Sequence, residues 1–109
     1  MKIVELEEII NNAFEDLQNI SEKSDTNILN AIRETIELTD KGELRVAIKE
    51  NGKWSVNQWI KKAILLSFRV NKMKTSKGPY AVWYDKVEGK TKNWNEKRFI
   101  KEGFRMVPN

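Results

Sequence analysis

Apolar and polar positions in the first part of the chain repeat with the period of an α-helix. In the opening segment the apolar residues fall three or four positions apart, with acidic residues between them. They are Ile3, Leu6, Ile10, Ala13, Phe14 and Leu17. This spacing predicts an amphipathic helix whose apolar face packs on a core.

A second apolar stripe of the same period follows at Ile28, Leu29, Ile32 and Ile36. Asp25 or Thr26 can cap the start of this second helix, and Gly42 can supply the left-handed residue after its end. Residues 21–25 lie between the two stripes. We therefore predict two helices joined as a hairpin.

The period of the pattern changes to two at Leu44. Apolar residues then alternate with polar ones on either side of Asn51-Gly52, at Leu44, Val46, Ile48, Trp54 and Val56. Asn-Gly between two such runs is the strongest short-range signal of a β-hairpin, because both turn positions need a positive φ. We predict a hairpin that turns at these two residues.

A third helix is predicted from about Gln58, with Asn57 or Ser55 as its cap. Its apolar positions are too many for one narrow stripe. They are Trp59, Ile60, Ala63, Ile64, Leu65, Leu66 and Phe68. We expect neighbouring elements to cover this helix on more than one side.

The last third of the chain alternates polar segments with short elements. Residues 72–79 and 88–92 predict exposed loops, whereas the aromatic run at residues 80–84 predicts a strand. Asn93 followed by Glu96 resembles a capping box for a short helix that ends at Gly103. Residues 104–107 then predict a final strand with no later partner, so we expect the sequence to have been cut short.

The predicted fold class is therefore α+β, a small and mostly helical domain with one β-hairpin and a short additional strand. The chain has 109 residues, and 39% of them are hydrophobic. A chain of this size can bury one modest core, so we expect a single domain that spans residues 1–109.

Composition excludes several kinds of site. The chain has no cysteine and no histidine. Their absence removes disulfides, Ser-His and Cys-His nucleophile pairs and nearly every zinc site. We expect no catalytic residue, cofactor-binding residue or metal ligand in this chain. No apolar run approaches the ~20 residues that span a bilayer, and the first five residues lack the apolar core of a signal peptide, so we expect a cytoplasmic protein without membrane contact.

Charge is distributed unevenly along the chain. Residues 1–43 hold 4 basic and 11 acidic side chains, whereas residues 44–109 hold 16 and 5. The second part therefore offers a cationic face to an anionic ligand or partner. Its basic cluster comprises Lys61, Lys62, Arg69, Lys72, Lys74 and Lys77. Such clusters can grip phosphates, so one alternative is a free-standing basic module that binds nucleic acid or an acidic protein.

The aromatic residues near this cluster favour packing over base stacking. Trp59 and Phe68 lie among leucines, where a role in the core explains an aromatic side chain better. No recognition-helix, zinc-finger or ribonucleoprotein motif accompanies the cluster, so the sequence does not favour nucleic-acid binding. Trp54, Trp83 and Trp94 are interpreted as packing residues as well.

Two arginines stand at informative positions. Arg105 follows the helix stop at Gly103 and comes directly after Phe104. A guanidinium presents a planar fork of donors that matches a carboxylate, and it stays charged at any working pH. Chemistry alone leaves a solvated surface charge as the commoner role for such an arginine. For Arg69 we expect a structural ion pair, for instance with Asp85.

Several separated motifs, in order along the chain, carry a family resemblance. They are Gly42-Glu43-Leu44-Arg45-Val46-Ala47, Gly52-Lys53-Trp54, the run from Asn57 to Arg69, Glu102-Gly103-Phe104-Arg105 and Val107-Pro108. Together they resemble the N-terminal domain of the tetrahydrodipicolinate N-succinyltransferase family, acyltransferases of bacterial lysine and diaminopimelate biosynthesis. The resemblance covers essentially the whole chain.

The resemblance implies a role for this chain and for one residue. Family members move a succinyl group from the co-substrate succinyl-CoA to tetrahydrodipicolinate. The arginine of their Glu-Gly-Phe-Arg motif contacts the dicarboxylate, which implies that Arg105 is substrate-binding. Their trimer contacts, CoA groove and acidic catalytic residues belong mainly to a left-handed β-helix of hexapeptide repeats, which is absent from this chain. Residues 1–109 are thus expected to be the N-terminal domain of a homotrimeric enzyme, inactive alone.

The sequence departs from the family pattern at residues 84–90. Family members have a proline after the Lys-Val pair that is Lys86-Val87 here, and an aromatic residue shortly beyond it. No role is carried over to this segment. A third interpretation is a purely structural interaction domain, in which replacing Arg105 would leave the kinetics of the full enzyme unchanged.

Overall fold

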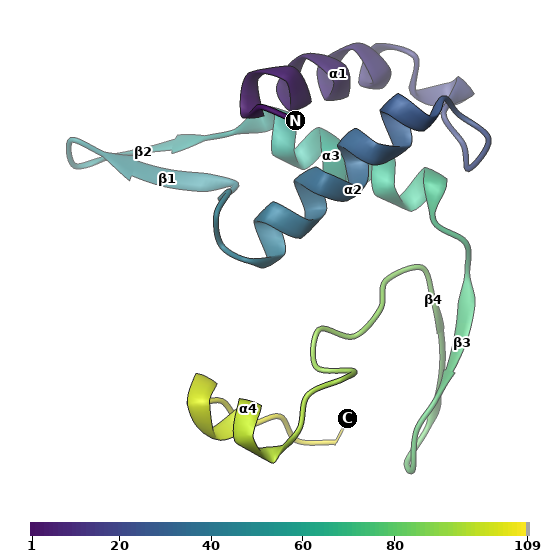
Figure 1. The fold of residues 1–109 in the computed structure, drawn as a ribbon, viewed down its shortest axis with the longest axis vertical. Helices are drawn as coiled ribbons and strands as arrows, with labels where there is room; N and C mark the ends of the chain where they lie inside the picture. Colours follow the sequence, from purple (N-terminus) through teal and green to yellow (C-terminus); the bar gives the residue numbers. More distant parts are fainter. Residues whose placement is uncertain (109) are drawn as a thin grey trace. The chain divides into compact units, whose positions relative to one another are not determined.

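The computed structural model describes residues 1–108 of the chain, which separates into two compact units (Figure 1). Unit 1 is Met1–Lys72 and unit 2 is Met73–Asn109. The fold is α+β, as predicted, with four α-helices and two antiparallel hairpins within the described residues. That residues 1–109 act as a single domain stays a prediction.

Three α-helices and a short 3-10 helix form the body of unit 1. They are α1 (Ile3–Glu15), η1 (Leu17–Asn19), α2 (Thr26–Asp40) and α3 (Gln58–Val70). Each of the three α-helices packs against the other two. All three predicted helices are thereby confirmed, and so is the expectation that α3 is covered from more than one side.

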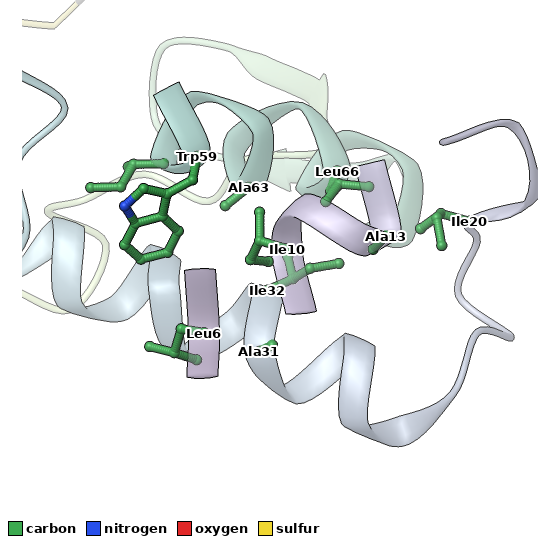
Figure 2. Packing of buried hydrophobic residues seen from close by; sticks show 10 residues of the cluster. Leu6, Ile10, Ala13, Ile20, Ala31, Ile32, Trp59, Ala63 and Leu66 are labelled. Carbon is green, nitrogen blue, oxygen red and sulfur yellow. The ribbon is translucent and has the colours of Figure 1, made fainter. Parts of the chain in front are cut away.

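The predicted apolar stripes supply most of the core of unit 1. Figure 2 shows this cluster, which consists of Leu6, Ile10, Ala13, Ile20, Ala31, Ile32, Trp59, Ile60, Ala63 and Leu66. Burial of large aliphatic side chains stabilises a fold by roughly 1.5–3 kcal/mol each. The outer side of α3 remains open, because Leu65 is 49% and Phe68 40% exposed. The prediction that Phe68 lies in the core is therefore wrong.

The hydroxyl groups buried beside this core have backbone partners. Thr35 Oγ1 donates to the Ala31 carbonyl at 2.8 Å, and Ser67 Oγ donates to the Ile64 carbonyl at 2.6 Å. Within residues 1–108, every buried side-chain nitrogen and oxygen has a hydrogen-bond partner. The core therefore carries no penalty for an unpaired polar group.

The first hairpin pairs β1 (Ala47–Glu50) with β2 (Lys53–Val56). Its turn is Asn51-Gly52, with φ of 51° and 78°, as predicted. The strand begins at Ala47 instead of Leu44, because Leu44 and Val46 pack against the helical core.

Two predictions next to this hairpin are corrected. Trp54 is 68% exposed, so it is not a packing residue within its unit. Asn57 occupies the cap position of α3 without a capping side-chain bond. Its side-chain amide instead donates to the Arg45 carbonyl at 2.8 Å, which ties the hairpin to the start of the helix.

Unit 2 contains a second hairpin and one short helix. Strand β3 (Lys74–Lys77) pairs with β4 (Val82–Asp85), and α4 spans Glu96–Glu102. The strand predicted at residues 80–84 is confirmed with a small shift. The prediction of a loop at residues 72–79 is wrong, because its Lys-Thr-Ser-Lys segment forms strand β3 through backbone pairing with β4. Trp83 is 47% exposed and lies outside the buried core, but its ring packs over Gly78, where an added Cβ would lie 2.8 Å from it.

The end of the chain differs from the prediction as well. The side chain that caps α4 belongs to Asn95, not Asn93, and it accepts a hydrogen bond from the Arg98 backbone N–H at 2.9 Å. Gly103 ends the helix with φ of 62°, as predicted. Residues 104–108 form no strand, so the predicted final strand is wrong.

Candidate functional site

Arg105 lies two residues beyond the end of α4, and its side chain is exposed. Among residues 1–108 its guanidinium has no hydrogen bond, ion pair or ring contact. The backbone before it is fixed by the helix end, where Gly103 N–H donates to the Ile100 carbonyl at 3.2 Å and Phe104 N–H to the Phe99 carbonyl at 3.3 Å. These bonds are those of a left-handed helix cap. Arg105 therefore presents a charged fork of donors to solvent from a defined turn.

Three aromatic rings pack together around this turn, and we call them the aromatic triad: Trp94, Phe99 and Phe104. The Trp94 ring meets Phe99 at a centroid distance of 5.1 Å and an interplanar angle of 62°, and Phe104 at 5.8 Å and 71°. Phe99 and Phe104 stack at 6.2 Å and 10°. Edge-to-face and offset arrangements of this kind stabilise a pair by ~0.5–1.5 kcal/mol beyond burial. The interpretation of Trp94 as a packing residue is confirmed.

Charged groups complete the surroundings of the triad. The Arg98 guanidinium lies 4.5 Å from the Trp94 ring centroid, and its Nε donates to Glu102 Oε1 at 3.0 Å. A shallow hollow of about 230 Å³ is lined by Lys90, Trp94, Glu102 and Phe104. Arg98 thus has partners already, whereas Arg105 does not among the described residues. The triad is not predicted from the sequence, because its members lie five positions apart and match no helical period.

A second cavity in unit 2 lies beside the β3–β4 hairpin. It has a volume of about 90 Å³, and its lining includes Lys74, Trp83, Glu88 and Lys92. Glu88 Oε1 lies 4.0 Å from Lys74 Nζ and 3.4 Å from Lys92 Nζ. Lys74 and Lys92 share this carboxylate, and Asp85 also lines the cavity, so acidic groups offset much of its positive charge.

Members of the predicted basic cluster contact different partners. Lys62 Nζ donates to Asn11 Oδ1 at 3.1 Å and lies 5.5 Å from the Phe14 ring centroid. Lys72 pairs with Glu22 at 3.5 Å. Trp59, predicted to pack, is only 6% exposed. These contacts favour structural roles for this part of the cluster, while binding of nucleic acid or an acidic protein stays a prediction.

Arg69 forms a different contact from the one predicted. Its Nε donates to the Ile20 carbonyl at 3.1 Å, and one of its terminal nitrogens donates to the Gln18 carbonyl at 3.0 Å. The carbonyl groups at the end of a helix have no hydrogen-bond partner within that helix. The guanidinium satisfies two of these, so Arg69 has a structural role within unit 1.

Possible metal ligands and membrane-spanning helices also bear on the chemistry of the chain. Among residues 1–108, no three carboxylate, imidazole or thiol groups come together in a way that could hold a metal ion. No helix in the same stretch has the length and apolar character needed to cross a membrane.

Comparison with known proteins finds one family and many relatives. Residues 5–70 match the family described as Tetrahydrodipicolinate N-succinyltransferase N-terminal. A 2,3,4,5-tetrahydropyridine-2,6-dicarboxylate N-succinyltransferase of Pelagibacter ubique is 57% identical over 108 residues, which cover 96% of this chain and 39% of the relative. The enzyme of the same name from Nitrobacter hamburgensis is 45% identical over 111 residues, covering 99% and 40%. The chain thus spans about two fifths of these relatives, and the similarity extends through both units.

Proposed function

The chain belongs to the tetrahydrodipicolinate N-succinyltransferase N-terminal family, and from this premise we propose that residues 1–109 are the substrate-side domain of a longer succinyltransferase. That enzyme transfers a succinyl group from succinyl-CoA to the amino group of ring-opened tetrahydrodipicolinate. It serves lysine and diaminopimelate biosynthesis as a cytoplasmic homotrimer.

Arg105 is the observation that carries the proposal. The relatives are named for a dicarboxylate, and a guanidinium binds a carboxylate with two parallel hydrogen bonds. Arg105 is exposed, follows a fixed turn and forms no ion pair within residues 1–108. Its fork of donors is therefore available to hold one carboxylate of the acceptor.

The chemistry divides between this chain and the rest of the enzyme. The acceptor amine loses a proton to a base and attacks the thioester carbonyl, and the tetrahedral intermediate then expels the CoA thiolate, which takes up a proton. A base and a donor to the thioester oxygen are needed for these steps. We assign both to the part of the enzyme outside residues 1–109, so this chain binds and orients the acceptor and does not catalyse the transfer alone.

The test is to replace Arg105 in the full-length enzyme. Arg105→Ala should raise the KM for the dicarboxylate by about tenfold or more, because a charge-assisted pair is lost, and should leave the KM for succinyl-CoA unchanged. Arg105→Lys keeps the charge but loses the planar fork, so it should recover only part of the affinity. An unchanged KM for the dicarboxylate in both variants would remove Arg105 from the site.

The proposed inactivity of the isolated chain has its own test. The purified 109-residue chain, mixed with both substrates, should release no CoA above the rate without protein. Steady release of CoA would contradict the assignment of the catalytic groups to the rest of the enzyme, because it would place them inside this chain.

A further inference from the structure

We infer that Trp94 is a positioning residue for Arg105, an inference that rests on the proposed function. It acts through Phe104, the residue before the arginine, by holding the chain where it leaves α4. Trp94 itself touches no substrate in this scheme. Its effect is on the direction in which the guanidinium is presented.

The helix that carries Arg105 needs such support. Helix α4 has seven residues, and none of them is buried. Isolated helices shorter than about 12–15 residues are marginal in water. The Asn95 cap and the Arg98–Glu102 ion pair support the helix itself, but both act before Gly103. Beyond the helix, the Thr91 hydroxyl donates to Met106 Sδ at 3.1 Å, after Arg105, so the side before Arg105 depends on Phe104.

Phe104 anchors the chain on the helix side of Arg105, and Trp94 is its nearest ring. The Phe104 centroid lies 5.8 Å from Trp94 and 6.2 Å from Phe99. Trp94 also meets Phe99 edge-on at 5.1 Å, and the Arg98 guanidinium lies over its ring. The indole therefore joins the residue after the helix to two residues within it. Without the indole, Phe104 keeps one ring contact and a backbone bond of 3.3 Å.

Loss of this anchor affects binding more than chemistry. An arginine on a loosely held chain must be ordered each time the acceptor binds, and that ordering opposes binding. Succinyl-CoA gains nothing from Arg105 in the proposed mechanism, so its KM serves as an internal reference. The acceptor KM is thus the quantity that separates positioning from general damage.

The experiment uses the full-length enzyme with Trp94→Ala, Arg105→Ala and the double variant. Trp94→Ala should raise the KM for the dicarboxylate by about fivefold without changing the KM for succinyl-CoA. Trp94→Phe retains a ring and should restore most of the affinity. In the Arg105→Ala background, Trp94→Ala should add little, because the group it positions is gone. Trp54→Ala, at an exposed tryptophan of unit 1, is the matched control and should change neither KM.

The outcomes distinguish this inference from the proposed function. If Arg105→Ala raises the acceptor KM and Trp94→Ala does not, the inference is overturned and the proposed function stands. If the two effects simply add, Trp94 acts independently of Arg105, and the inference is again overturned. If Arg105→Ala has no effect, the proposed binding site fails first and the inference falls with it. Should Trp94→Ala not fold, Phe104→Leu tests the same link by removing the ring from the other side.

Discussion

Unit 1 and unit 2 are stabilised in different ways. Every buried hydrophobic residue of the described chain lies in unit 1, whereas none of residues 73–108 is buried. Unit 2 instead relies on backbone pairing in one hairpin and on the aromatic triad. The candidate ligand-binding residue lies in unit 2. The chain thus separates a well-packed scaffold from a lightly packed segment that carries the candidate function, a common arrangement in proteins.

The strongest test of this comparison is a truncation in the core of unit 1. Leu66→Ala should lower the free energy of unfolding by about 2–5 kcal/mol, because Leu66 is fully buried and its loss leaves a cavity. The neighbouring Leu65, 49% exposed on the same helix, is the matched control, and Leu65→Ala should change it by less than about 1 kcal/mol. Urea unfolding followed by far-ultraviolet circular dichroism measures both. Equal effects of the two substitutions would contradict the assignment of the core.

A smaller effect is expected from the polar contact that supports the same core. Arg69→Lys should lower the free energy of unfolding by about 1–2 kcal/mol, since one ammonium nitrogen would replace the two guanidinium nitrogens that donate separately to the Ile20 and Gln18 carbonyls. Arg33→Lys, at an exposed position of α2, provides the control and should be nearly neutral. If Arg69→Lys were as mild as Arg33→Lys, water would satisfy the two carbonyls equally well.

The smallest effect is expected in unit 2, at the turn before Arg105. Gly103→Ala places a side chain at φ of 62°, which should destabilise the end of α4 by about 1 kcal/mol. Gly89→Ala is the control: an added Cβ meets nothing within 4 Å there, as at Gly103, and the backbone is not left-handed. Amide hydrogen exchange at Gly103 and Phe104 measures the change. Faster exchange throughout unit 1 would contradict the comparison, because it would show that the two units unfold together and do not differ in stability.

Much of unit 1 could be predicted from its sequence. The helices follow from apolar spacing that continues for several turns, and the first hairpin from an Asn-Gly pair that needs positive φ. Trp54 could not be placed, because an aromatic at a strand position has the same pattern whether its face is covered or open. The contacts of Arg69 could not be predicted either, since its acceptors are backbone carbonyls about 50 residues earlier in the chain.

Unit 2 was less predictable for a physical reason. Strand β3 has the sequence Lys-Thr-Ser-Lys, which carries no apolar alternation, so only its pairing with β4 defines it. Residues 104–106 alternate in polarity, which resembles a strand, yet the Phe104 ring packs on Trp94 and Phe99. For the candidate site, Arg105 came from the family resemblance. The triad required the structure, because a left-handed turn at Gly103 brings its rings together.

The two hairpins have a consequence for solubility. Each strand of either sheet has one partner within residues 1–108, so its other edge leaves backbone groups open to a strand of another molecule. Three of these strands carry lysines, whose charge opposes pairing with another molecule: Lys49 in β1, Lys53 in β2, and Lys74 and Lys77 in β3. Strand β4, Val-Trp-Tyr-Asp, has only the single charge of Asp85 at its end. At high protein concentration, β4 is therefore the edge where association between molecules should begin.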